Sequence, residues 1–257
     1  MIEFEQIIYI TMDKLLSLTI DLRIFCNKIL DNYRNRKSLD FPKEHLFIHY
    51  LERLEANLDS VRILIPELAD NQKIEHSIGL ILRSNMADFF TIIYISMGKL
   101  HSEKKWIDRI CIVNYDQTKH IRKDLTISFK NGWLTKEQQE LGLSKIEKDY
   151  SFMKNLTELD LDDQKNKLPG SQKITEEMLK NTNMKSLARG YELFKYYSQY
   201  EHYGFITSII KNVDFSTDLD RIKRTLYYSC SSLNFIIMNL ELWEYLEEGK
   251  VITSKFE

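Results

Sequence analysis

Glycine and proline are scarce in this sequence. Eight glycines and three prolines among 257 residues are roughly a third of the share that average composition gives. All-β folds need these residues for their turns, and phosphate-binding loops need clustered glycines. The scarcity therefore argues against both classes and favours an all-α protein.

Signals for secretion and for disulfide bonding are also missing. The three cysteines, Cys26, Cys111 and Cys230, lie far apart and form no C-x-x-C pair, a pattern typical of reduced thiols and not of a disulfide framework or a zinc knuckle. The N-terminal residues carry acids where a secretory signal would carry lysines. We expect a cytoplasmic protein.

The chain has no excess of charge of one sign. Its 36 Lys+Arg residues nearly balance its 38 Asp+Glu residues, which leaves a formal net charge of −2. This balance argues against a polybasic arm and an acidic tail. The short basic clusters at 34–37, 119–123 and 221–224 are expected to lie on solvated helix faces, and they give nucleic-acid binding little support.

The most apolar stretch is broken by charges. Residues 78–98 are about as long as a membrane span, yet Arg83, Asn85 and Asp88 lie near the middle. A charged residue at the centre of a bilayer costs several kcal/mol. The stretch is therefore predicted to be a core helix, with no membrane partner.

Apolar residues recur at helical spacing along most of the chain. The pattern predicts an all-α bundle of about seven or eight mostly long helices. The predicted helices cover, approximately, residues 7–33, 41–66, 74–99, 103–129, 135–159, 175–181, 184–211 and 217–248. Asn131-Gly132 is a typical helix stop, Thr135 with Gln138 forms a capping-box pattern, and Gly249 is expected to end the last helix.

One segment has the composition of a loop. Residues 159–173 contain an acidic cluster followed by Pro169-Gly170-Ser171. No shift in composition separates the two sides of this segment. We therefore expect a single helical domain spanning residues 1–257, with a long loop at 159–173.

The polar residues within the apolar helix are the first candidate site. At about 100° per residue, Ser84, Asn85 and Asp88 share one face, while Arg83 lies about 140° from Asp88. Buried polar and charged groups need partners, so side chains from other helices should converge there. Two interpretations stay open: a hydrogen-bond network that fixes helix register, and a polar pocket that binds a small ligand in the bundle core.

The second candidate site is the aromatic segment 189–204. Ser198 and His202 are four residues apart, so they share a helix face, and Phe194 precedes them on that face. The unperturbed pKa of histidine, about 6.5, would suit His202 as a proton carrier, and Ser198 and Tyr197 could bind a ligand together with Asn85. The alternative is that these side chains belong to the core.

Metal and cofactor motifs are absent. His45 and His49 are four residues apart, a spacing that can hold one ion, but the sequence lacks the glutamate of H-E-x-x-H. Di-iron bundles need Glu-x-x-His pairs, and none occurs. We predict neither a metal nor a cofactor.

The two candidate segments together resemble a known group of proteins. Leu82, Arg83, Asp88 and Phe89 in the first, and Phe194, Ser198 and His202 in the second, resemble bacterial helical families likened to HEPN-type domains. Many of these families are linked to phage defence and toxin–antitoxin systems. The chain departs from HEPN ribonucleases because no arginine is followed by a histidine at the usual spacing of four to six intervening residues. The resemblance therefore implies a fold more than a nuclease activity.

Three functions remain open from the sequence. The first is a cytoplasmic binding or interaction module, placed in bacterial defence or stress response by the resemblance. The second is a metal-independent ribonuclease in which Arg83, Asp88 and His202 are catalytic. The third is a small-ligand pocket in the core. Protein, RNA and a second copy of the chain are all possible partners.

Overall fold

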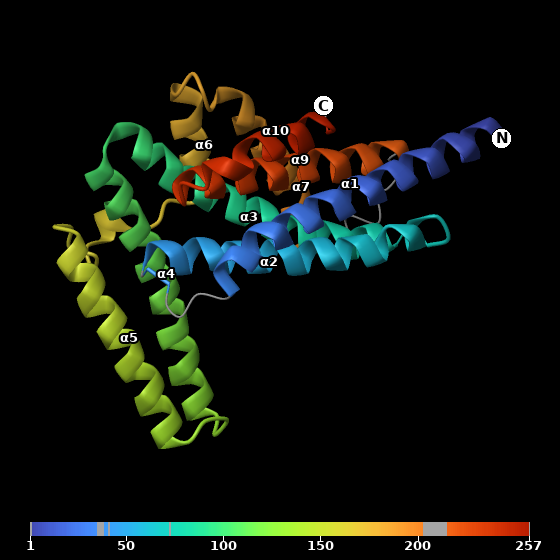
Figure 1. The fold of residues 1–257 in the computed structure, drawn as a ribbon. Coiled ribbons are helices and arrows are strands. Elements are labelled where there is room, and N and C mark those ends of the chain that lie inside the picture. Colours follow the sequence, from blue (N-terminus) through green and yellow to red (C-terminus); the bar gives the residue numbers. More distant parts are fainter. Residues whose placement is uncertain (1, 35–38, 41, 72, 203–214, 257) are drawn as a thin grey trace. The chain divides into compact units, whose positions relative to one another are not determined.

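The fold is entirely helical over the part of the chain that the structure describes. The computed structural model describes residues 2–34, 39–40, 42–71, 73–202 and 215–256, and no strand occurs in these ranges (Figure 1). The prediction of an all-α bundle is confirmed. The α-helices are α1 (Ile2–Arg34), α2 (Lys43–Leu64), α3 (Ile74–His101), α4 (Glu103–Lys130), α5 (Lys136–Leu156), α6 (Ser171–Lys180), α7 (Gly190–His202), α9 (Phe215–Asn239) and α10 (Leu246–Ser254).

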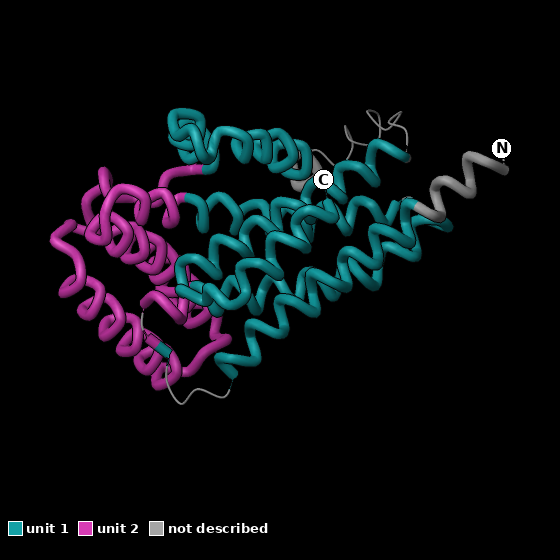
Figure 2. The backbone as a smooth tube through the Cα atoms, turned by 45° about the horizontal axis from the view of Figure 1, so that its top comes forward, with its two compact units in different colours: residues 1–39, 47–93, 171–257 teal, residues 40–46, 94–170 magenta. Residues whose placement is uncertain are grey.

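The chain divides into two compact units. The first comprises residues 1–39, 47–93 and 171–257, and the second comprises residues 40–46 and 94–170 (Figure 2). The long helix α3 contributes its first part to one unit and its end to the other. The expectation of a single domain stays a prediction.

In the first unit, helices α1 and α2 pack antiparallel. Cys26 on α1 contacts Leu51 on α2. One turn before Cys26 on α1, Arg23 pairs with Glu55, which lies one turn after Leu51 on α2, so the two helices run in opposite directions. Helix α9 packs against α1, α7 and α10. The core consists of large apolar side chains with almost no exposed surface, among them Leu22, Phe25, Ile29, Leu51, Leu58 and Phe89.

In the second unit, α4 and α5 form an antiparallel hairpin. The side chain of Leu125 on α4 lies against Gly142 on α5, where a Cβ atom would come within 2.8 Å of it. Near the start of α4, the ammonium groups of Lys43 and Lys99 both lie against the buried Trp106 ring, each 4.8 Å from its centroid. All three cysteines of the chain are buried and free, as the sequence predicts.

The local signals at the hairpin turn are confirmed. Asn131 ends α4, and Gly132 takes the left-handed conformation with φ of 72°. Such a conformation favours glycine because a side chain would be strained there. The Thr135 side chain accepts from the Gln138 backbone N–H while the Gln138 side chain accepts from the Thr135 backbone N–H, which completes the capping box.

Several predicted helix boundaries are wrong, among them the start of α6, which begins at Ser171 within the predicted loop and not at 175. The last predicted helix ends at Asn239, nine residues before its expected end at 248, and a turn with Glu241 at φ of 59° precedes α10. Gly249 lies inside α10. Helix α9 leaves no room there for a side chain, since a Cβ at this position would lie 2.0 Å from Oδ1 of Asn234. Helix α7 begins at Gly190, after a 3-10 turn at Lys185–Arg189, and not at 184; its predicted end at 211 lies outside the described residues.

Helix α3 is the most apolar element. It is the one helix in the described ranges that is long and apolar enough to cross a membrane, judged by length and composition. In its most apolar window, 61% of the residues are buried inside the structure. That burial is what a core helix shows.

Candidate functional site

The structure brings Arg83 and Ser198 together. The Arg83 guanidinium on α3 donates from Nε to Oγ of Ser198 on α7 at 3.2 Å, and it lies over the Phe194 ring, 5.7 Å from the centroid. The Ser198 hydroxyl in turn donates to the Phe194 carbonyl at 2.7 Å. The three residues that the sequence placed in two separate segments therefore form one contact between α3 and α7.

Asp88 belongs to a different contact. Its carboxylate accepts two hydrogen bonds from Arg53 on α2, at Oδ2 from Nε at 2.7 Å and at Oδ1 from Nη2. Burial raises the pKa of the Asp88 carboxyl to about 6, while the charge and hydrogen bonds of Arg53 act in the opposite direction. The predicted catalytic set of Arg83, Asp88 and His202 stays a prediction: Arg83 contacts α7, and Asp88 pairs with Arg53, which the sequence did not single out.

Asn85 lies in the interior between three helices. Its Oδ1 accepts from Nδ2 of Asn57 on α2 at 2.7 Å, and its own Nδ2 donates to Oγ of Ser229 on α9 at 3.2 Å. These are the convergent partners that a buried amide needs. Asn85 therefore contributes to a hydrogen-bond network that links α2, α3 and α9.

Tyr197 is also in the interior. Its side chain has no exposed surface, and burial raises the pKa of its phenol far above the usual value, although a hydrogen bond with Thr225 lowers it in part. A phenol without solvent access cannot meet a ligand from solution in this structure. Helix α7 continues to His202, whose side chain lies outside the described residues.

Little space is left around this polar set. A cavity of about 10 Å³ borders Asn85 and Asp88, together with Tyr50 and Ser232. This volume is on the order of what one water molecule requires. The described residues thus leave no room for an organic ligand at the centre of the predicted core pocket.

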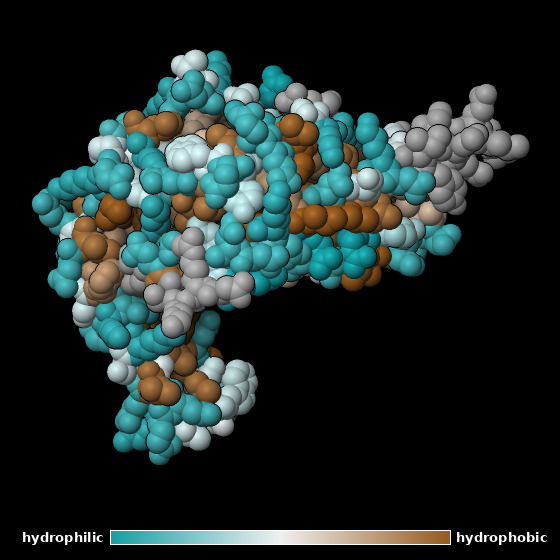
Figure 3. Space-filling view, in the orientation of Figure 1, coloured by the Kyte–Doolittle hydropathy of each residue, from teal (hydrophilic) through white to brown (hydrophobic). Residues whose placement is uncertain are grey.

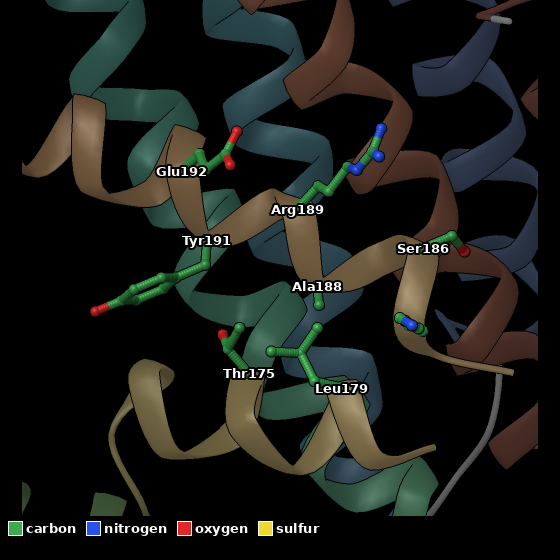
Figure 4. A pocket seen from close by; sticks show the side chains of 8 residues that line it. Thr175, Leu179, Ser186, Ala188, Arg189, Tyr191 and Glu192 are labelled. Atoms are coloured by element: carbon green, nitrogen blue, oxygen red, sulfur yellow. The ribbon is translucent and has the colours of Figure 1, made fainter. Parts of the chain in front are cut away.

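A much larger groove lies elsewhere in the first unit, between α6 and the start of α7. Its volume is about 680 Å³. It is lined by Thr175, Leu179, Lys185, Ser186, Ala188, Arg189, Tyr191 and Glu192. In Figure 4, Thr175 and Leu179 of α6 point toward Ala188, while the side chains of Arg189 and Glu192 extend away from α6. The groove therefore has an apolar floor and a charged edge.

The charges at this edge are not neutralised by direct pairing. Among the described residues, neither Lys185 nor Arg189 forms an ion pair or a side-chain hydrogen bond. Arg189 and Arg224 both lower the pKa of the Tyr228 phenol, which burial raises, and Glu192 raises it further. Two arginines and one glutamate therefore lie near the Tyr228 hydroxyl.

Sequence reasoning missed this groove. Residues 175–192 contain no motif with a known chemistry, and the groove exists only because α6 turns back along the chain that leads into α7. The one available signal was the pair of basic residues, Lys185 and Arg189, on either side of the small residues Ser186 and Ala188. That signal is too common to identify a site.

Comparison with known proteins gives no match that bears on function. No family model, no curated protein and no solved structure resembles this chain at a significant level.

Proposed function

We propose that this chain is a helical binding module that holds a segment of a partner protein in the groove between α6 and α7. The observation that carries the proposal is the groove itself, about 680 Å³ with an apolar floor. By contrast, the polar residues of the core are satisfied by one another around a space of about 10 Å³. Space for a ligand is thus offered at the surface and not in the core.

The groove suits a peptide that combines an apolar side chain with an acidic one. Leu179 is half-exposed on the floor and Tyr191 supplies an aromatic wall, so a large apolar side chain would bury surface there. Lys185 and Arg189 carry charges without a partner in the described part of the chain. A carboxylate from the partner would pair with them, and Glu192 would oppose a second one close by.

A peptide-binding measurement tests this proposal. The probes are fluorescein-labelled peptides with one Leu, Phe or Trp flanked by Asp and Glu, followed by fluorescence anisotropy. We expect the double variant Lys185→Glu/Arg189→Glu to weaken binding at least about tenfold, which is about 1.4 kcal/mol. Leu179→Asp should weaken it as well, because a carboxylate on the floor would repel the apolar anchor.

The matched control changes the same charge in the other unit. Lys145 and Lys148 are exposed on α5 and form no ion pair within the described ranges, so Lys145→Glu/Lys148→Glu should leave binding unchanged. Equal losses in both double variants would mean non-specific attraction. Equal binding of peptides with glycine in place of the apolar anchor would also refute the proposal.

A second function is favoured by the contact between Arg83 and Ser198. That hydrogen bond places the guanidinium beside α7, one helical turn before the position of His202. A metal-independent ribonuclease would use these two residues, and Asp88, paired with Arg53, would support α3. The purified protein should then degrade RNA in the presence of a chelator, and His202→Ala should abolish the activity; equal activity in both proteins would exclude this function.

The cellular setting is part of the proposal. A cytoplasmic location rests on the scattered, unpaired cysteines, and a role in bacterial defence or stress response rests on the resemblance to HEPN-type families. A fluorescent fusion would test the location. A phage challenge of cells with and without the gene would test the role.

A further inference from the structure

The tip of the α4–α5 hairpin exposes large apolar side chains. Trp133 is 72% exposed, and Ile127 and Phe129 are exposed beside it. In the space-filling view, apolar and hydrophilic residues stand side by side where α4 gives way to α5 (Figure 3). Exposed apolar side chains gathered in this way mark an interaction site.

The fold does not use these side chains. The buried residues of α4 lie between Trp106 and Asn114, and those of α5 are Ile146 and Met153. Beyond them, toward the turn, no side chain of either helix is buried. The apolar side chains of the tip therefore lower the solubility of the protein without adding to its core.

The charge of the tip is positive. Residues 125–136 include Lys130 and Lys136 and no acidic residue. Lys136 lies 3.6 Å from Glu140 in an exposed pair, which contributes little. Acidic side chains begin again only at Asp124 and Glu137, on the two helices that lead away from the turn.

The exposed side chains surround the turn and do not form one face. Ile127 and Phe129 are two residues apart on α4, so they point about 160° away from each other. A flat protein surface covers only one side of such a tip. A medium that encloses the tip on all sides would cover both residues and Trp133 together.

We propose that the hairpin tip binds the surface of a membrane that contains anionic lipids. Tryptophan favours the interface between water and hydrocarbon, because its ring is apolar and its N–H is polar. Lysine side chains can reach lipid phosphates while their methylene groups stay in the apolar layer. The site would be peripheral and shallow, since Asp124 and Glu137 limit how deeply the helices can enter.

The turn is built to present these residues in a fixed position. Gly132 in the left-handed conformation and the capping box of Thr135 and Gln138 hold both helix ends. Little conformational entropy is then lost when Trp133 enters the interface. The proposal differs from the sequence-based expectation of no membrane partner, and it is independent of the groove between α6 and α7.

Vesicle binding tests the proposal directly. The full chain is mixed with phosphatidylcholine vesicles, with or without phosphatidylserine, and the bound fraction is measured by sedimentation. We expect binding to the anionic vesicles that weakens as salt is added. Trp133→Ser and Lys130→Glu/Lys136→Glu should each lower the partition constant at least about fivefold, whereas the groove variant Lys185→Glu/Arg189→Glu should not change it.

Trp243 provides a matched control. It is 56% exposed in a 3-10 turn of the other unit, so Trp243→Ser removes a comparable ring and should bind vesicles as the unchanged protein does. In a Trp243→Phe background, the emission of Trp133 should shift to shorter wavelength with anionic vesicles, because Trp106 is already buried.

Three results would overturn the proposal. One is the absence of binding to anionic vesicles by a folded protein. Another is a loss with the lysine variant but none with Trp133→Ser, which would mean charge attraction without insertion. The third is a shift of Trp133 emission with protein concentration alone, which would assign the tip to contact between copies of the chain. We expect each variant to fold, because Trp133 and Lys130 are exposed. Thermal melting checks this.

Discussion

Arg53 of α2 holds the carboxylate of Asp88 on α3 by two hydrogen bonds. One turn away along the same pair of helices, Asn57 donates to Asn85. The two polar pairs lie in one antiparallel interface between α2 and α3. They fix the register of α2 against α3, because a shift by one turn would leave a buried carboxylate and a buried amide without partners.

Asp88 should make stability depend on pH. Burial raises its pKa from 3.8 to about 6 in the folded chain. Between these values the native state keeps a proton that the unfolded state has lost, so this group's contribution to stability decreases as pH rises through the window. We expect Asp88→Asn to match the unchanged protein near pH 4 and to exceed it at pH 7 by up to about 3 kcal/mol. Urea unfolding at several pH values measures this, and parallel stability curves for the two proteins would contradict it.

Removing Arg53 should have the opposite effect at neutral pH. Arg53→Ala leaves the buried Asp88 carboxylate without its cation, and we expect a loss of about 1–3 kcal/mol, less than for a fully buried pair because Arg53 is 37% exposed. The loss should shrink near pH 5, where Asp88 takes up a proton, and Asp88→Asn in the same chain should reverse it.

Arg62 on the same helix is the control for this change. Its side chain is 36% exposed, almost as Arg53 is, but its partner Asp59 lies at the surface. Arg62→Ala should therefore cost less than about 1 kcal/mol. Similar losses for both arginines, measured by urea unfolding at pH 7, would show that the burial of Asp88 does not matter.

Gly249 should not tolerate a side chain. A Cβ atom would lie 2.0 Å from Oδ1 of Asn234, whose amide group is held by a 2.8 Å hydrogen bond to Thr253. We expect Gly249→Ala to cost about 1–3 kcal/mol, and Asn234→Ala to remove most of that cost in the double variant. Gly170→Ala is the control, because nothing lies within 4 Å of a Cβ there; differential scanning fluorimetry compares the variants. A Gly249→Ala protein as stable as the control would contradict the close approach of α9 to α10.

Asp162 should hold the loop that follows α5. Its two carboxylate oxygens accept hydrogen bonds from the hydroxyls of Tyr115 and Tyr150, whose rings stack 5.1 Å apart. We expect Asp162→Ala to speed tryptic cleavage after Lys165 and Lys167, since both lie in this loop. Asp149→Ala removes a carboxylate from α5 and should leave the cleavage rate unchanged. Equal rates for both variants would mean that the tyrosines do not restrain the loop.

The helices were predictable because their signals are local. The capping box at Thr135 and the stop at Asn131-Gly132 involve neighbours in sequence, and both occur as expected. Gly249 shows the limit of such reasoning. A glycine near the end of a helical pattern predicts a stop, but this one is required by Asn234, which reaches it only after the chain has turned back on itself.

The candidate site was predictable only in part, for the same reason. The sequence shows that Arg83, Asn85 and Asp88 need partners, because their burial in an apolar helix would otherwise be costly. It cannot name Arg53 or Ser229, which lie on other helices and carry no motif. The groove between α6 and α7 depends entirely on how two short segments pack, so no spacing in the sequence indicates it.

The three buried cysteines can report local unfolding of the helices around them, because a thiol reacts only when it is exposed. Burial raises the pKa of Cys26 and Cys111 to about 12 and that of Cys230 to about 11. A thiol reagent can therefore modify each cysteine only after the surrounding helices separate. Cys26 and Cys230 belong to the first unit, and Cys111 belongs to the second. Alkylation rates at the three positions therefore distinguish a chain that opens as a whole from one whose parts open separately.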